Sequence, residues 1–542
     1  MEEQEQLAKR TLALVFHAKK PLTVEQLQHA LATELNEPRF DTENISQIED
    51  IIDVCAGLLT VNEENKTVRL VNYTAQEYFE RTHTQWFPEA NNMIISICIT
   101  YLSFEVFATG PCLIDSEFED RLLAYPFYDY ASRHWGHHAY PNSTLHEIRC
   151  FVDRTPQLEA SNQALQVLDR VSKYTNYSGD YPQRVTGLHL AGYFGLSELA
   201  ISLGMKYSVD VRDSYGRTPL WYASSTGQES TVALLLDKGA DYEVKDQFGK
   251  APLACAAHFG SEAVTEQLVR AGADIDTVDY LDQTPLAFAA WNGHETVVDK
   301  LCCHNANTEI SDARYGQTPL LGAATNGYMP VVQILLKRGA NYESKNKYGR
   351  SALLVAAWAG FDEIVQLLLN HGANPTSLDD IGRSVLFYMV TTEHVSILER
   401  LLTDKRLDVN IRDRYGSTPL SVAICHNKVS MVEILLSNPS ICLQTVDNFG
   451  RSALWWAKRK GLFGIEKLLC DTANANGLVL RPVDDLEGVP VYFINSSTAA
   501  CDVCWSFVTE SSPLYCEGCN GGDFDICIDC ISKGAVCLCE LE

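Results

Sequence analysis

Eight of the chain's 18 cysteines fall within its last 42 residues, at spacings that suit a metal site. Three pairs have the Cys-x2-Cys spacing, and a single residue separates the last pair. The eight candidate ligands are Cys501, Cys504, Cys516, Cys519, Cys527, Cys530, Cys537 and Cys539. Each Cys-x2-Cys knuckle points two thiolates at one ion, and four thiolates complete the tetrahedral shell of Zn²⁺. We therefore expect one or two structural zinc ions, with no open position for activating water.

The order of residues in this cluster, Cys501-Asp-Val-Cys, Tyr515-Cys-x2-Cys and Phe524-Asp-Ile-Cys-x2-Cys, resembles the ZZ-type zinc finger. The resemblance implies a cross-brace, in which Cys501, Cys504, Cys527 and Cys530 hold one ion and Cys516 and Cys519 hold the other. That family completes the second ion with histidines, which are missing here, so either Cys537 and Cys539 replace them or the second site is incomplete. Some ZZ modules hold a basic peptide or a free N-terminal amine with acidic residues, which match Asp502, Asp523 and Asp525. The alternative role for these carboxylates is to accept hydrogen bonds beside the zinc.

A short motif, roughly Thr/Ser-Pro/Ala-Leu-x-x-Ala, organises most of the remaining chain. It recurs every 32 to 34 residues, starting at Thr186, Thr218, Ala251, Thr284, Thr318, Ser351, Ser384, Thr418 and Ser452. Threonine or serine caps a helix, and proline is tolerated in its first turn. An apolar run about ten residues later predicts a second helix, which a Gly-Ala pair often ends. One such unit cannot bury its own apolar face, so the units must stack.

This period and the TPL-type openings resemble the ankyrin repeat, and they predict a solenoid of about nine repeats over residues 186–475. The resemblance implies that a partner contacts the turn tips and the first helices. Because aromatic side chains dominate binding hot spots, we expect contacts at Tyr215, Phe248, Trp291, Tyr315, Tyr348, Trp358 and Tyr415. The alternative is that the tip aromatics only pack on the next turn. A basic row just before the openings is either solvated or paired with aspartate, or it steers an acidic partner, and it comprises Arg217, Lys250, Arg350, Arg383 and Arg451.

Residues 1–85 predict three helices and a hairpin, the pattern of a winged helix. Thr23 and Gln26 have the capping-box spacing at the start of the second helix. The sequence segments PLTVEQL, CAGLL and VRLVNYTAQEYF resemble the region that follows the nucleotide-binding module in fungal NACHT–ankyrin proteins, which are innate-immunity-type receptors. Residues 1–80 carry 7 basic and 15 acidic residues, so protein packing is favoured over DNA binding. Residues 86–180 predict a helical connecting region, residues 476–499 a linker and residues 500–542 the zinc module.

The whole chain of 542 residues therefore predicts a mostly α protein without enzymatic activity. The net charge of −27 disfavours nucleic acid as a partner. Neither a Gly-x4-Gly-Lys-Ser/Thr phosphate loop nor a Gly-x-Ser-x-Gly or His-Glu-x-x-His motif occurs. We find neither a membrane span nor a signal peptide pattern, so we expect a cytoplasmic protein, with the nucleus as the alternative. The expected function is a protein–protein interaction scaffold, and the alternatives are a ubiquitin-pathway adaptor or ligase component and a transcriptional regulator.

Overall fold

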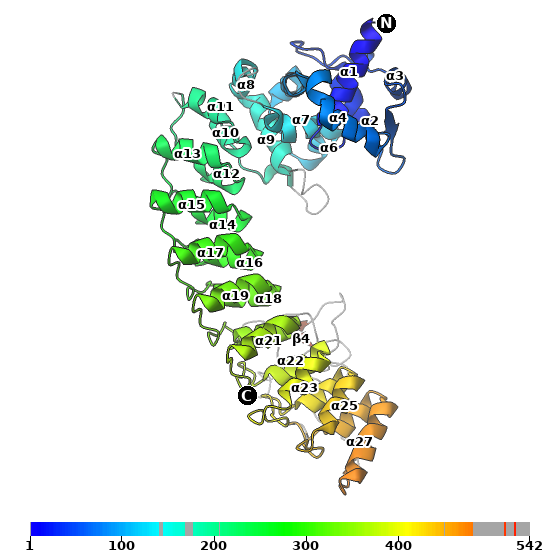
Figure 1. Ribbon diagram of the computed structural model, residues 1–542, viewed down its shortest axis with the longest axis vertical. Helices are drawn as coiled ribbons and strands as arrows, with labels where there is room; N and C mark the ends of the chain where they lie inside the picture. Colours follow the sequence, from blue (N-terminus) through cyan, green and yellow to red (C-terminus); the bar gives the residue numbers. More distant parts are fainter. Residues whose placement is uncertain are drawn as a thin grey trace. The chain divides into compact units, whose positions relative to one another are not determined.

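The computed structural model describes residues 2–139, 145–167, 177–204, 206–448 and 450–480, together with two short strands near the C-terminus. The chain forms two compact units, Met1–Tyr280 and Leu281–Glu542 (Figure 1). Most described residues are helical, as predicted. The eight candidate zinc ligands, the acidic residues Asp502 and Asp523 and the side chain of Asp525 lie outside the described part.

The first unit begins with the predicted winged helix. Its elements are α1 (Glu2–His17), α2 (Val24–Ala32), η1 (Thr42–Asn44), α3 (Ile48–Val54), β1 (Leu59–Val61) and β2 (Val68–Leu70). Thr23 and Gln26 form the predicted capping box at the start of α2. The strands pair antiparallel, with Leu59 opposite Leu70, and Leu59 and Val68 are buried with Leu27 and Ile51. Apolar residues at alternate strand positions and on one face of each helix therefore build a common core.

Between the winged helix and the repeats, the residues that the structure describes form eight short helices. They are α4 (Tyr73–Trp86), α5 (Ala90–Leu102), η2 (Glu105–Thr109), α6 (Asp115–Ala124), α7 (Phe127–His134), η3 (Trp135–His138), α8 (Leu145–Val152) and α9 (Thr155–Val167), followed by the single turn η5 (Tyr177–Gly179). Trp135 is fully buried, and its ring centroid lies 4.9 Å from that of Phe194 in the first repeat. A Cβ on Gly136 would lie 2.2 Å from the Phe194 ring, so this contact tolerates no side chain. The connecting helices and the first repeats thus share one core.

Of the three histidines in the Arg-His-Trp-Gly-His-His segment, His138 is buried in this core, His134 is half-buried and His137 is exposed. His138 Nε2 lies 2.8 Å from the Tyr130 hydroxyl, and its Nδ1 lies 3.1 Å from Asn91 Oδ1. Burial lowers the pKa of His138 to about 3, so the ring is neutral at physiological pH. The ring centroid of His134 lies 4.7 Å from that of Tyr130. The hydrogen bonds of His138 and the ring contact of His134 therefore belong to the packing of the connecting helices.

Nine helix pairs follow over residues 187–475, one for each copy of the motif. In the first unit they are α10 (Gly187–Phe194) with α11 (Ser197–Leu203), α12 (Pro219–Ser225) with α13 (Glu229–Asp237), and α14 (Pro252–Phe259) with α15 (Glu262–Ala271). In the second unit they are α16 (Pro285–Asn292) with α17 (Glu295–Cys303), α18 (Pro319–Asn326) with α19 (Met329–Lys337), α20 (Ala352–Ala359) with α21 (Asp362–Asn370), α22 (Val385–Thr392) with α23 (Val395–Leu401), α24 (Pro419–Cys425) with α25 (Val429–Ser437), and α26 (Ala453–Arg459) with α27 (Phe463–Ala475). Figure 1 shows the paired helices stacked within each unit.

The motif's first residue caps the first helix in most repeats. Thr218, Thr284 and Thr318 each accept a hydrogen bond from the backbone N–H three residues on, as the capping argument predicts. Ser351 and Ser384 make no such bond, so these two helices begin without a side-chain cap. Their first turns are nevertheless held, because residues 352–357 and 385–390 are buried.

Two short strands lie in the predicted zinc module. They are β3 (Leu514–Tyr515) and β4 (Asp525–Ile526), which pair antiparallel with Leu514 opposite Ile526. In the sequence they stand on either side of the second Cys-x2-Cys pair.

Candidate protein-binding surface

Within each unit, neighbouring repeats meet at tight turn tips that a buried aspartate or asparagine organises. At the first tip, Asp213 Oδ1 accepts the backbone N–H groups of Tyr215 and Arg217, at 2.8 and 2.9 Å. Gly216 has a φ of 75°, which a residue with a Cβ rarely adopts. The same bonds recur from Asp246, Asn346, Asp379 and Asp413. The tip shape therefore follows from a short sequence pattern, Asp/Asn-x-x-Gly.

Backbone hydrogen bonds join neighbouring tips into an edge within each unit. In the first unit, Gln247 N donates to Tyr215 O at 2.7 Å. In the second, Lys347 N donates to Tyr315 O at 2.9 Å, and Arg414 N donates to Ile381 O at 2.7 Å. The residue after each buried aspartate or asparagine thus contacts the aromatic or aliphatic position of the preceding tip. This regular edge is the surface on which the predicted contact residues lie.

Two of the seven predicted contact aromatics are well exposed. Phe248, at a tip of the first unit, is 51% exposed, and Trp291, on α16 of the second, is 40% exposed. Two further aromatics of the first unit are open as well: Phe259 at the end of α14 is 56% exposed and Tyr280 is 73% exposed. Tyr280 was missed as a candidate, because the repeat pattern places Leu281 at the tip position.

Four predicted aromatics are half-buried beneath guanidinium groups. Arg217 lies over the rings of Tyr215 and Trp221, with its Cζ 5.0 and 4.4 Å from their centroids. Arg350 lies 5.5 Å from the centroids of both Tyr348 and Trp358. Arg314 lies 4.9 Å from the Tyr315 centroid. For these residues the alternative of packing within the edge fits the contacts, because a cation over a ring is itself a stabilising partner.

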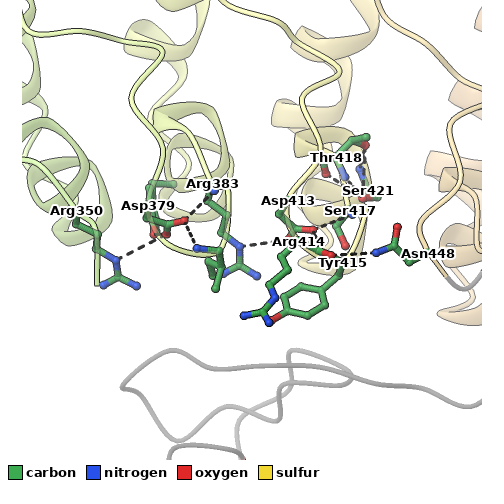
Figure 2. Close-up of polar contacts among 12 residues, drawn as sticks. Arg350, Asp379, Arg383, Asp413, Arg414, Tyr415, Ser417, Thr418, Ser421 and Asn448 are labelled. Carbon is green, nitrogen blue, oxygen red and sulfur yellow. Dashed lines mark hydrogen bonds and ion pairs between the residues drawn. The ribbon is translucent and has the colours of Figure 1, made fainter. Parts of the chain in front are cut away.

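Tyr415 requires a correction, because it is only 4% exposed. Asp413 Oδ1 accepts the backbone N–H of Tyr415 at 3.0 Å, within the turn drawn in Figure 2. A residue with so little accessible surface offers almost no contact area to a partner. It belongs to the packing of the edge instead.

The predicted basic row pairs with buried aspartates in the second unit. Arg350 Nε lies 3.9 Å from Asp379 Oδ2, Arg383 Nε lies 3.3 Å from Asp413 Oδ2, and the corresponding contact of Arg451 with Asp447 is 2.6 Å. Figure 2 shows the first two contacts, each of which joins one repeat to the next. These three arginines are at most 6% exposed, so aspartate pairing, and not steering of a partner, accounts for them.

Burial controls the charge of this network. Desolvation raises the pKa of Asp413, while Arg383 and the backbone N–H groups of Ser417 and Tyr415 oppose that rise. Asp379 also accepts a short hydrogen bond from the Tyr388 hydroxyl, whose pKa burial raises. The network is therefore a structural joint between repeats, built from desolvated charges that depend on one another.

A different set of cations, which the sequence interpretation missed, is exposed along the same edge. It comprises Arg314, Lys345, Lys347, Arg412 and Arg414, all exposed and all at tips of the second unit. In the part of the chain that the structure describes, none of the five forms an ion pair with a carboxylate. Arg414 lies beside the paired Arg383 and Asp413 in Figure 2 without such a contact. These five residues are called the tip cations below.

Neither a membrane span nor a metal cluster is found in the described ranges. None of the helices there is both long and apolar enough to cross a bilayer. Within the same ranges, no three His, Cys, Asp or Glu side chains are grouped so that they could hold a metal ion. The predicted zinc ligands lie outside those ranges and are not tested by this result.

Comparisons with known proteins agree with this architecture. A family model described as "GPI inositol-deacylase, winged helix domain" matches residues 2–103. No curated protein sequence matches the chain. Among solved structures, the ankyrin repeat domain of Bcl-3, described as a unique member of the IkappaB protein family, is 27% identical over 41% of this chain and 98% of that one, with a TM-score of 0.37. A family model for ankyrin repeats matches residues 160–246, 242–312, 286–379 and 386–479. Because these ranges span more than half of the sequence, the chain belongs to the ankyrin repeat family.

Proposed function

We propose that this chain is a non-enzymatic scaffold that binds a protein partner through its ankyrin tips and first helices. The observation that carries the proposal is the exposure of large aromatics on these elements. Phe248 and Tyr280 lie on adjacent tips, whose backbones are joined by a 3.1 Å hydrogen bond, and both rings are more than half exposed. Such aromatics contribute little to the fold but supply large contact areas with few rotatable bonds in an interface.

A photo-crosslinking amino acid tests the location of this interface. It would replace Phe248 or Phe259 in the full chain expressed in cells, and the control position is the exposed Asp237 on α13. We expect the same protein adduct, identified by mass spectrometry, at positions 248 and 259 but not at 237. Adducts that are equally abundant at all three positions, or absent at 248 and 259, would contradict the proposal.

For the C-terminal module, we propose one or two structural zinc ions and a second ligand. The donor set supports this idea, because eight thiols in three Cys-x2-Cys pairs and one Cys-x-Cys pair suit Zn²⁺, and the apolar content is too low for a metal-free core. Elemental analysis of the full chain, with thiol titration, tests it. Two zinc ions with all eight thiols protected would support the cross-brace, whereas a metal-free chain with reactive thiols would contradict it.

The order of domains supports a relationship to NACHT–ankyrin receptors, since a winged-helix match precedes the repeats. Transcriptional regulation is disfavoured. The third helix of the winged helix, α3, exposes Glu49, Asp50 and Asp53. An acidic helix repels the phosphate backbone on which DNA affinity depends. For the ubiquitin alternative, autoubiquitination with purified E1 and E2 remains the direct test.

A further inference from the structure

We propose that the tip edge of the second unit selects an acidic, extended protein segment, which the tip cations contact. This inference rests on the proposed scaffold function and names the chemistry of the partner. It is carried by the placement of charge along residues 312–451, where five exposed cations lie on three turn tips, and the tip at 379–383 carries none.

The contacts of the tip cations leave their charge unneutralised. Lys345 Nζ donates to the carbonyl of Leu378 at 2.7 Å, and Arg412 Nη2 donates to the carbonyl of Val446 at 3.0 Å. Lys347 Nζ likewise donates to the carbonyl of Ala313. A carbonyl orients an ammonium or guanidinium group but carries no net charge. Lys345, Lys347 and Arg412 are therefore held by neighbouring carbonyl groups while their charge remains available to an anion.

The acidic side chains of the same tips do not cancel this charge at the surface. Asp312, Asp379, Asp413 and Asp447 are all buried, and they accept backbone N–H groups of their own turns. Along residues 312–451, Asp380 is the exposed acid among the described tip residues, while the exposed Asp282 lies before this stretch, at the first tip of the unit. The edge thus presents five positive charges against one negative charge, on a chain whose net charge is −27. A positively charged surface on an otherwise acidic chain is electrostatically complementary to an acidic ligand.

An acidic polypeptide fits this edge better than a nucleic acid does. A long phosphate backbone would extend beyond the edge into the field of the acidic remainder, whereas a short segment interacts within a Debye length of about 8 Å at physiological salt. Bases bind non-specifically by stacking on open aromatic rings. Here the Tyr315 and Tyr348 rings lie under Arg314 and Arg350, and Tyr415 is buried. An extended segment can instead place successive carboxylates opposite successive tips.

Charge reversal at matched positions tests the inference. The test variant of the full chain carries Arg314→Glu, Lys347→Glu and Arg414→Glu. The control variant carries Lys337→Glu, Lys405→Glu and Lys467→Glu, which lie on second helices and on the loop after α23 and are also exposed. Both variants change the net charge equally, so only the position of the charge differs. The ligand is a fluorescent peptide that alternates Asp or Glu with Leu or Tyr, and its counterpart carries Asn and Gln in place of the acids.

Fluorescence anisotropy should show that wild type and the control variant bind the acidic peptide. The test variant should bind it with an affinity at least about tenfold lower, because each exposed ion pair contributes modestly to binding and each reversed charge adds repulsion. Affinity should fall as salt rises. Equal binding of the neutral peptide, no binding by wild type, or equal loss in both variants would overturn the inference. Tighter binding of a single-stranded RNA of equal charge would assign the edge to nucleic acid instead. Circular dichroism checks folding, and an Arg314→Gln, Lys347→Gln and Arg414→Gln variant serves if the reversal unfolds the chain.

The crosslinking experiment separates this inference from the scaffold function itself. Its positions, Phe248 and Phe259, lie in the first unit and not among the tip cations. If adducts form there while the acidic peptide fails to bind, the scaffold proposal stands and the charge selection falls. If adducts fail as well, both proposals fall.

Discussion

Replacing Arg383 with methionine should destabilise the joint between the repeats that contain α22 and α24. Arg383 is 4% exposed, and its Nε lies 3.3 Å from Asp413 Oδ2. Methionine keeps much of the aliphatic volume but removes the charge and the hydrogen-bond donors. The substitution therefore leaves the buried Asp413 carboxylate without its cationic partner.

The magnitude follows from what Asp413 retains. Removing one member of a buried ion pair typically costs about 3 to 5 kcal/mol, because the remaining charge stays desolvated. Asp413 Oδ1 still accepts the backbone N–H groups of Tyr415 and Ser417, at 3.0 and 2.9 Å. We therefore expect the opening free energy of this joint to fall by an amount near the lower end of that range, about 3 kcal/mol at neutral pH.

The pH dependence gives this prediction a second signature. Burial already raises the pKa of Asp413, and removing Arg383 should raise it further. A native pKa above the unfolded value of about 3.9 means that the native state binds a proton first as the pH falls. Protonation relieves the uncompensated charge. The loss caused by Arg383→Met should thus be largest above the raised native pKa and should shrink as the pH falls towards the unfolded value.

Hydrogen exchange measures this joint locally, which suits a repeat array that need not unfold in one step. Opening free energies of peptides from α22 and α24 would be compared between wild type, Arg383→Met, Asp413→Asn and the double variant at two pH values. We expect a coupling of about 1 to 3 kcal/mol between the two sites, so that the double variant loses less than the two single losses combined. Additive losses, or a cost that does not change with pH, would refute the reasoning.

Three further outcomes are expected. Acidification should weaken the packing of α10, because burial lowers the pKa of His189 to about 4. As the pH falls below about 6.5, the unfolded ring binds its proton before the native ring does, so the opening free energy that hydrogen exchange measures near α10 should drop by about 2 kcal/mol at pH 5. The drop should be smaller in His189→Gln. Gly192→Ala should cost about 1 to 3 kcal/mol in chemical denaturation, since its Cβ would lie 2.4 Å from Pro219 O, whereas Gly464→Ala, with no heavy atom within 4 Å, should be neutral or slightly stabilising. A chelator should remove one or two zinc ions per chain, as counted by elemental analysis, while the helical melting of the repeats stays unchanged; a zinc-dependent melting transition of the repeats would contradict the separation of the two modules.

The repeat period made most of the fold predictable. Threonine, proline, leucine and alanine at fixed spacing specify where each first helix begins, and the cap at Thr218 is the one that the motif predicts. The winged helix was also readable, since Thr23 and Gln26 form their capping box and the hairpin lies between β1 and β2. The repeat motif and the capping box are both local in sequence, and hydrogen bonds between nearby residues determine the structure that each one forms. The shared core of Trp135 and Phe194 was not predictable, because it joins residues far apart in the sequence.

The contact surface was only partly predictable, for a related reason. An aromatic residue at a tip can pack within the edge or remain exposed for contact with a partner, and the sequence alone does not distinguish the two roles. Tyr348 and Trp358 are covered by Arg350, while Phe248 remains 51% exposed although it occupies the equivalent tip position. The position after the tip glycine differs between them, since it is Arg350 in one and Lys250 in the other. Arginine presents a broad planar cation that stacks on rings, whereas lysine is a compact point charge.

The position of a basic residue relative to the tip aspartate decides its use. The residue four places after the aspartate donates its backbone N–H to that carboxylate, as Arg383 does to Asp379 at 2.8 Å, and its side chain is turned into the joint. The residues immediately before and after the aspartate are not drawn inwards, and Arg412 and Arg414 are both exposed around Asp413. The same spacing around Asn346 separates the exposed Lys345 and Lys347 from the buried Arg350. A basic residue is thus structural four places after the tip aspartate or asparagine and exposed immediately before or after it, and Arg314, two places after Asp312, is exposed as well. This is why the tip cations, and not the buried arginines, carry the expected selection of an acidic segment.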